Sequence, residues 1–139
     1  MKYLNLKFGI TLTVLLMLML GTGKSIFSQQ AGQWVAPEDA SKVTNPYAGD
    51  EQVTKDGETL FTQLCLVCHG KKGKGDGIGG MSLNPRPSNF TKSAVQDQSD
   101  GALYWKITTG RPPMAAYETV LNDKQRWSLV NYIRKFKKD

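Results

Sequence analysis

The chain has 139 residues, a length typical of one domain, and 18 basic against 12 acidic residues give a formal net charge of +6. Three of the basic residues are lysines within residues 1–28, so the rest of the chain has 15 basic and 12 acidic residues and a net charge of +3. This mild excess of positive charge does not indicate nucleic-acid binding. With only two cysteines and one histidine, the chain also lacks the Cys/His donor set of a four-ligand structural zinc site.

The first 28 residues have the pattern of a secretory signal peptide. Lys2 and Lys7 form a basic start, and Phe8–Leu20 is an uncharged, mostly apolar run of 13 residues. That run is short for a membrane span, which needs ~20 apolar residues. We expect residues 1–28 to be removed by cleavage near Ser28, with an uncleaved membrane anchor as the alternative. Either outcome predicts a periplasmic or otherwise extracytoplasmic protein, in which cysteine pairs can be oxidised.

The rest of the chain divides into a lead-in and one domain. Residues 29–49 are polar and contain Trp34, Pro37 and Pro46, and we expect an extended segment that either wraps the domain or docks on a larger complex. Residues 50–139 are expected to form the domain. Because no convincing run of alternating apolar and polar residues predicts strands, the predicted fold class is all-α.

Three helices are expected in this domain. The first spans about 54–69 with Asp50 or Thr54 as its cap, because apolar residues and both cysteines recur there at steps of three and four. The second spans about 99–109 and ends at Gly110. The third spans about 122–137, with Asn122 or Asp123 as its cap and basic residues at its C-terminal end.

Glycine marks two further features. Residues 70–97 form a long loop with six glycines and two prolines, and loops of this length in small domains are usually functional or wrapped around something. Gly57 lies on the apolar face of the first helix. Since glycine in a helix costs ~1 kcal/mol relative to alanine, we expect another element to approach the chain closely there.

The most informative motif is Cys65-Leu66-Val67-Cys68-His69, a C-x-x-C-H sequence typical of covalent attachment of c-type haem. Residues three apart in a helix lie ~5–6 Å from each other, so both thiols can reach the two vinyl groups of one haem. The adjacent His69 is then placed to bind the iron. The sequence therefore predicts one haem c.

Other uses of this motif are open. A disulfide or thioredoxin-like redox pair also has the C-x-x-C spacing, but it belongs in a βαβ context that we do not find. A zinc site would need a fourth ligand. A chance occurrence would have to use both cysteines and the only histidine of the chain.

The sixth iron ligand has to come from methionine or stay open, because there is no second histidine. Met114 follows His69 by 45 residues, in a loop stiffened by Pro112 and Pro113 that can cross the far face of the haem. Met81 follows His69 by 12 residues, in the Gly-rich loop on the histidine side. We expect Met114 as the ligand, with Met81 or an exchangeable site as alternatives.

From Gly57 to Phe136 the chain resembles a class I c-type cytochrome. The matching pieces are GETLFTQLCLVCHG, GKGDG, YWKITTGRPPM and WSLVNYIR, in the family's order. The resemblance implies three main helices and long loops wrapped round one covalently bound haem. It implies thioethers at Cys65 and Cys68 and axial iron ligands at His69 and Met114, and it places the aromatic ring of Trp105 near the haem edge.

The resemblance also implies a helix crossing, in which Gly57 and Phe61 pack against Tyr132. One position departs from the pattern, because similar sequences often have proline where Ile78 stands, and the proline carbonyl accepts a hydrogen bond from the haem-binding histidine. Here the carbonyl of Ile78 or of Pro85 is expected to accept that bond, which would tune the haem potential.

Ligation by methionine and histidine raises the haem potential and fills both axial positions of the iron. The expected function is therefore electron transfer in an exported respiratory chain, as a free carrier or as a monohaem subunit of an oxidoreductase complex, without catalytic residues of its own. The expected partners are redox proteins, including a membrane respiratory complex. The alternative is a haem enzyme or gas sensor with an exchangeable sixth ligand.

Overall fold

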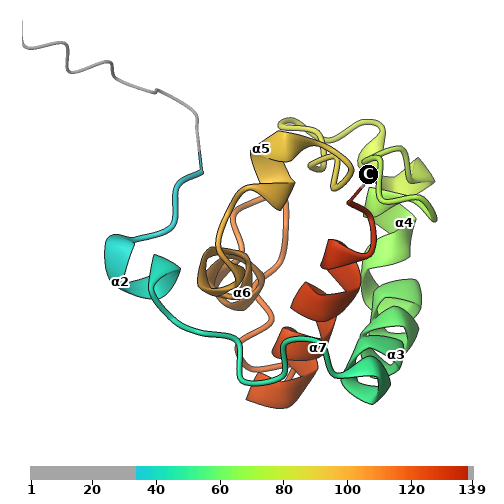
Figure 1. Ribbon diagram of the computed structural model, residues 1–139. Helices are drawn as coiled ribbons and strands as arrows, with labels where there is room; N and C mark the ends of the chain where they lie inside the picture. The colour runs from blue at the N-terminus through green and yellow to red at the C-terminus, as the bar shows by residue number, and fades with distance from the viewer. Residues whose placement is uncertain (1–33, 138–139) are drawn as a thin grey trace, which may run out of the picture. The chain divides into compact units, whose positions relative to one another are not determined.

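The computed structural model describes residues 34–137, and the named elements in this range are helices (Figure 1). In chain order they are α2 (Glu38–Ser41), α3 (Glu51–Leu60), the π-helical turn η1 (Phe61–Cys65), α4 (Leu66–His69), the 3₁₀ turn η2 (Ile78–Gly80), α5 (Ser93–Gln96), α6 (Asp100–Thr109) and α7 (Asp123–Arg134). No strand occurs between residues 34 and 137, where Arg111 and Met114 form an isolated antiparallel bridge. The predicted all-α fold class is confirmed.

The cysteine motif ends a helical stretch that runs without a break from α3 through η1 to α4. It begins three residues before the expected start, because Asp50 caps it by accepting a hydrogen bond from the Val53 amide at 2.9 Å. In η1 the turn widens, so the amide of Leu66 bonds the carbonyl of Phe61, five residues back. Such single π turns occur frequently at functional sites.

The core of the domain lies where α3 crosses α7 (Figure 1). A Cβ atom at Gly57 would come within 1.9 Å of the Ser128 carbonyl oxygen, so the two backbones touch. The rings of Phe61 and Tyr132 lie 5.2 Å apart. The expected crossing is confirmed, except that Gly57 meets Ser128, one turn before Tyr132. Around it, the buried apolar residues include Leu103, Ile107, Trp127, Leu129, Val130 and Ile133.

The last two long helices begin at clear caps. The Ser99 side chain accepts a hydrogen bond from the Ala102 amide at the start of α6, and Gly110 ends that helix as expected. Asn122 and Gln125 form a reciprocal capping box at the start of α7. The α7 helix ends at Arg134, three residues short of the expected end.

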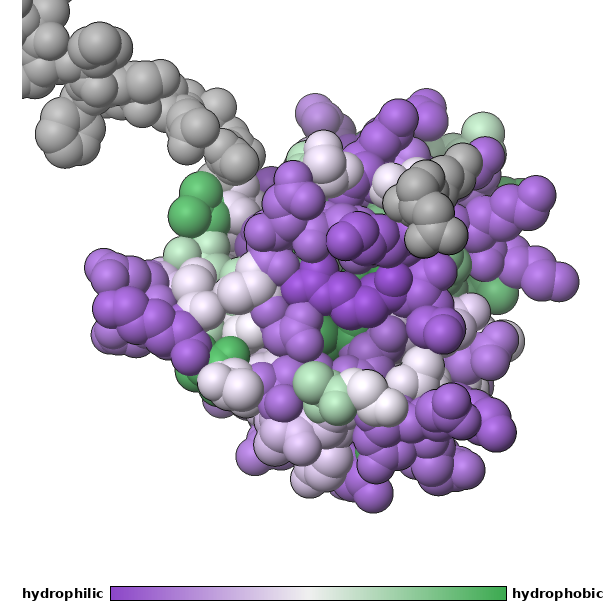
Figure 2. All heavy atoms as spheres, viewed as in Figure 1, coloured by the Kyte–Doolittle hydropathy of each residue, from purple (hydrophilic) through white to green (hydrophobic). Residues whose placement is uncertain are grey.

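The segment before α3 was expected to be extended. Residues 34–49 contain the short helix α2, which packs against α6, and are otherwise without regular structure (Figure 1). The face of the domain in Figure 2 is largely hydrophilic, with hydrophobic side chains in small separate groups.

The predicted signal peptide, residues 1–28 with cleavage near Ser28, lies outside the described residues. Within residues 34–137, no helix combines the length and the apolar character that crossing a membrane requires.

Candidate functional site

A cavity of about 360 Å³ opens beside α4, a volume within the usual range for small-molecule sites. It is lined by three separate parts of the chain and by Trp34. These parts contribute Leu64, Cys65, Cys68 and His69 from η1 and α4, Leu83, Pro85, Arg86, Pro87 and Ser88 from the Gly-rich loop, and Arg111, Pro113, Met114, Ala115 and Tyr117 from the loop before α7. All four predicted site residues, Cys65, Cys68, His69 and Met114, therefore meet in one cavity.

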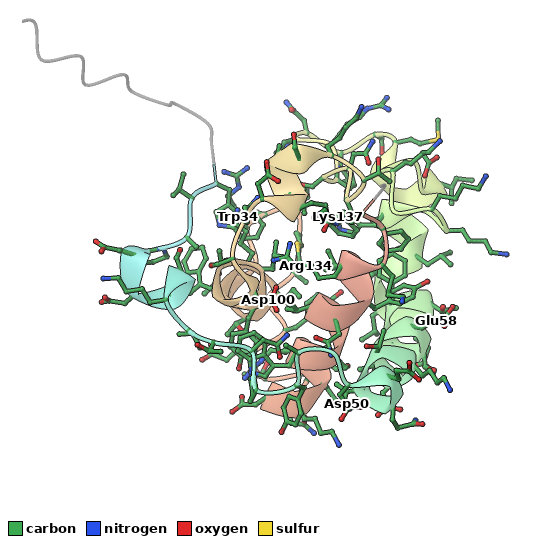
Figure 3. All side chains as sticks on the ribbon, in the orientation of Figure 1. Trp34, Asp50, Glu58, Asp100, Arg134 and Lys137 are labelled. Atoms are coloured by element: carbon green, nitrogen blue, oxygen red, sulfur yellow. The ribbon has the colours of Figure 1, made fainter. Side chains whose placement is uncertain are left out.

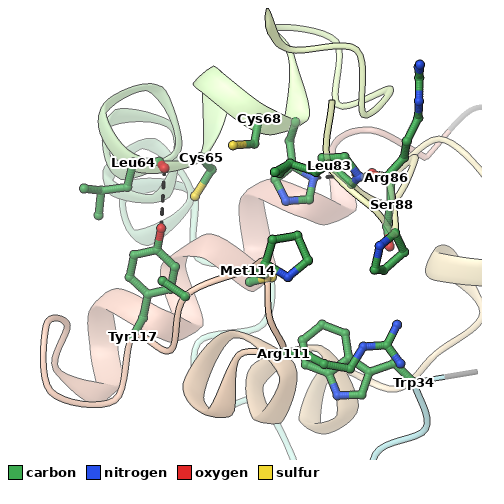
Figure 4. Close-up of a pocket in the computed structure, with 15 residues that line it drawn as sticks. Trp34, Leu64, Cys65, Cys68, Leu83, Arg86, Ser88, Arg111, Met114 and Tyr117 are labelled. Atoms are coloured by element: carbon green, nitrogen blue, oxygen red, sulfur yellow. Dashed lines mark hydrogen bonds between the residues drawn. The ribbon is translucent and has the colours of Figure 1, made fainter. Parts of the chain in front are cut away.

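Both cysteines point into this cavity from the same helical wall (Figure 4). Neither is in a disulfide, so both are free thiols. Burial and, secondly, the charge of Cys68 raise the pKa of the Cys65 thiol to about 12.

His69 follows on the last turn of α4 and is held from two directions. Its Nδ1 atom lies 3.3 Å from the carbonyl oxygen of Ser88, and the Phe90 ring stacks on the imidazole at a centroid distance of 4.4 Å. Burial lowers the pKa of His69, and the bond to Ser88 opposes this shift. The neutral ring with a proton on Nδ1 has its lone pair on Nε2, the atom that can bind iron.

The acceptor of this histidine bond differs from both expected carbonyls. Ile78 lies in η2 with its side chain 84% exposed. The backbone next to it packs against α4 instead, since a Cβ atom at Gly77 would come within 2.4 Å of the Val67 carbonyl oxygen. Pro85 lines the cavity, but it is the carbonyl of Ser88, three residues later, that comes within bonding distance of His69.

Met114 enters the cavity from the wall opposite the cysteines (Figure 4). The backbone of the loop holds it, because the Arg111 amide bonds the Met114 carbonyl at 3.1 Å and the Met114 amide bonds the Arg111 carbonyl at 2.8 Å. From the same loop, the Tyr117 hydroxyl reaches the Leu64 carbonyl of η1 at 3.4 Å. The loop is thus closed by the backbone bonds between Arg111 and Met114, and Tyr117 attaches it to the helix that carries the cysteines.

The alternatives left open by the sequence receive less support. Met81 is 56% exposed and is not among the residues that line the cavity. In the described range 34–137, no group of three or more His, Cys, Asp or Glu side chains is placed to hold a metal ion, so no partner set for zinc forms around the motif.

Three residues of the site are not predicted as site residues from the sequence. Ser88 acts through its backbone and Phe90 through a ring stack, and neither has a local signal in the sequence. Trp34 lines the cavity, whereas Trp105, the expected aromatic, is not a lining residue and contacts Trp34 at 6.2 Å. The signal available for Trp34 was its isolation as a large aromatic residue in a polar segment.

The donor set and the lining of the cavity fit a c-type haem. Two thiols on one helical wall, an imidazole that lines the same cavity and a thioether on the opposite wall are the groups that such a haem requires. Apolar side chains and prolines supply much of the remaining lining, which suits a flat apolar ring.

The comparisons with known proteins agree with this fit. The family model described as cytochrome c oxidase, cbb3-type, subunit III matches residues 52–133. No curated protein matches the chain. Among solved structures, the chain is similar to a chain of the Kuenenia stuttgartiensis reducing HAO-like protein complex Kustc0457/Kustc0458, with a TM-score of 0.59 and 25% identity over 69% of this chain and 50% of that one. It is also similar to the KustC0563 c-type cytochrome, with a TM-score of 0.52 and 30% identity over 60% of this chain and 99% of that one. The matched region thus spans half the length of the first neighbour and nearly all of the second.

Proposed function

Because the chain belongs to the family of the cbb3-type cytochrome c oxidase subunit III, whose domain is a c-type cytochrome, we propose that Cys65 and Cys68 bind its haem covalently and that His69 and Met114 ligate the iron. The class I cytochrome fold, the covalently bound haem c and electron transfer as the function follow from the family and from the solved neighbours. These predictions are confirmed. The assignment of individual residues is the proposed part.

One observation carries this assignment. The cysteine pair on one wall of the cavity faces Met114 on the other, and His69 lines the same cavity, although 45 residues separate His69 from Met114 in the sequence. Three features support it further: the neutral His69 ring, the paired backbone bonds that hold Met114, and the exposed position of Met81.

When bound, haem supplies an iron that gains or loses one electron at a time. The chain's own part is to fix and to shield that group. Cys65 and Cys68 anchor one edge, Ser88 and Phe90 fix the imidazole of His69, and the apolar lining excludes water. If His69 and Met114 both ligated the haem iron, they would leave no position on it open to oxygen or peroxide. The function we propose is therefore that of an electron carrier or a redox subunit without catalytic residues of its own.

The setting we propose is extracytoplasmic, in a respiratory chain. The signal-peptide pattern of residues 1–28 and the c-type attachment motif both support it. The solved neighbour from a reducing HAO-like protein complex supports a role as a subunit that passes electrons to or from a larger redox protein. Anchoring through an uncleaved N-terminal segment remains the alternative to a free periplasmic carrier.

The ligand assignment is tested with Met114→Ala, using Met81→Ala as the matched control. We expect Met114→Ala to keep covalent haem, to lose the absorption band of methionine bound to oxidised iron, and to lower the midpoint potential. Met81→Ala should leave both the band and the potential unchanged. The opposite pattern would contradict the assignment. Rapid carbon monoxide binding by the reduced unmodified protein would favour a gas sensor or haem enzyme instead.

A further inference from the structure

Trp34 lies before the residues that the family model matches, yet it lines the cavity. Figure 4 shows it beside Arg111, on the far side of the cavity from Cys65 and Cys68. Its indole ring has a cation on each of two neighbouring side chains, with the Lys106 ammonium 5.5 Å and the Arg111 guanidinium 5.2 Å from the ring centroid. Trp105 contacts it as well, at a centroid distance of 6.2 Å. Trp34 is therefore held in place by three side chains of the domain.

The segment that carries Trp34 is anchored to the domain at its backbone. A Cβ atom at Gly101 of α6 would come within 2.2 Å of the Ala40 carbonyl oxygen and 2.6 Å of the Val43 carbonyl oxygen. Only glycine permits this approach, so the turn around α2 sits directly on α6. Ala36, two residues after Trp34, is also buried.

A buried polar network fixes the end of the same segment. The Asn45 side chain, 6% exposed, donates hydrogen bonds to Asp100 and Asn131, each at 2.8 Å, and Asn131 donates to the Tyr47 carbonyl at 2.7 Å. Buried amides that are fully partnered in this way specify one arrangement of the chain. Residues 34–49 are thus a folded part of the domain, and the position of Trp34 is defined by that anchoring.

On the premise of the haem site proposed above, we propose that Trp34 covers the haem cavity, that it keeps water from this side of the haem, and that it raises the midpoint potential. The segment 34–49 then has a redox function of its own: it supplies a cavity residue that the matched family region lacks. Trp34 is a positioning and shielding residue, whereas the iron ligands remain His69 and Met114.

The physical basis for the raised potential is the free-energy cost of placing the added positive charge of the oxidised haem in a poorly hydrated site. Oxidation adds one positive charge, and water admitted to the cavity would stabilise that charge and lower the potential. The two neighbouring cations act in the same direction, because each disfavours an added positive charge. Burial and, secondly, the charge of Arg111 lower the pKa of Lys106.

The test uses the full chain with its haem and three variants. Trp34→Ala removes the indole ring, Trp34→Phe retains an aromatic ring, and Val35→Ala is the control, because Val35 is adjacent in sequence, 63% exposed and not a cavity residue. For each protein, covalent haem content, helix content, midpoint potential and the rate of imidazole binding to the oxidised iron are measured.

We expect Trp34→Ala to retain haem and helix content, to have a lower midpoint potential and to bind imidazole at least threefold faster. Trp34→Phe should fall between Trp34→Ala and the unmodified protein, and Val35→Ala should match the unmodified protein. An unchanged potential and binding rate in haem-loaded Trp34→Ala would overturn the inference while leaving the haem site intact. If Trp34→Ala does not fold, an unchanged potential and rate in Trp34→Phe would overturn it equally. Unmodified protein without covalent haem would overturn the proposed site itself.

Discussion

The imidazole of His69 depends on two contacts that come from one stretch of the Gly-rich loop. Its Nδ1–H donates a hydrogen bond to the Ser88 carbonyl, and Phe90 stacks on its face with an interplanar angle of 15°. Phe90 is itself 9% exposed and lies against Phe61 and Phe136 in the core. The orientation of the proposed iron ligand is therefore coupled to core packing.

Phe90→Ala is predicted to alter His69 as well as stability. Removal of a buried aromatic ring costs about 3–5 kcal/mol of unfolding free energy. The freed imidazole should also change the electron paramagnetic resonance g values of the oxidised haem. Val53→Ala, a buried position at the start of α3, serves as the control that loses stability without a change in g values. Unaltered g values in haem-loaded Phe90→Ala would show that the stack does not orient His69.

The site could be predicted from sequence to the extent that its chemistry is local. Cys65, Cys68 and His69 are fixed by one helical turn, and Met114 is one of only two methionines available after the signal-peptide region. Ser88, Phe90 and Trp34 could not be predicted, because their contacts depend on where loops 19 to 35 residues away in sequence fold back. The incorrect choice of the Ile78 or Pro85 carbonyl as the acceptor of the His69 hydrogen bond has the same cause.

The helices are arranged around the contact of α3 with α7. The absence of a side chain at Gly57 allows the backbones of these two helices to touch. In an exposed helix, alanine in place of glycine stabilises by about 1 kcal/mol. At this position the added methyl group has no room, since Ser128 backbone atoms occupy its site.

Gly57→Ala is therefore expected to destabilise the domain by about 1–3 kcal/mol, the cost of overpacking, despite the better helix propensity of alanine. Chemical denaturation followed by circular dichroism measures this change. Thr59→Ala, at an exposed position of the same helix, is the control and should stay close to the unmodified protein. A Gly57→Ala domain at least as stable as the unmodified one would mean that the two helices do not touch at Ser128.

The spacing of apolar residues predicted that the long helices exist and in which order they follow. It did not predict the residues at which they begin and end, or the wider turn within one of them. The start of α3 depends on Asp50 as cap, and the π turn at Phe61–Cys65 has no signature in the spacing. α7 ends at Arg134, and no residue of the sequence around 134–137 marks that end.

The domain as a whole is held at the junction of α5, α6 and α7 by Arg134. Its guanidinium pairs with Asp100, which Figure 3 shows on the neighbouring helix. It also donates hydrogen bonds to the carbonyls of Gln96 at 2.9 Å and Gln98 at 2.6 Å. Asp100 also accepts the bond from Asn45, so the lead-in segment joins the same network.

Arg134→Ala removes charge-assisted bonds to a half-buried carboxylate and to two carbonyls. The expected loss is about 1.5–3 kcal/mol, the usual range for hydrogen bonds to charged groups. Lys135→Ala, the neighbouring exposed residue, should change stability by less than about 0.5 kcal/mol. Equal effects of the two substitutions in urea denaturation would argue against a structural role for the network.

Covalent attachment of haem to the cysteine pair is decided by mass spectrometry of the purified, matured protein after alkylation and trypsin digestion. Cleavage at Lys55 and Lys71 releases one peptide, residues 56–71, that holds both cysteines and His69. We predict that this peptide has the mass of its sequence plus one haem and has no alkylated thiol. Recovery of the peptide without haem and with two alkylated cysteines would contradict the proposed haem site.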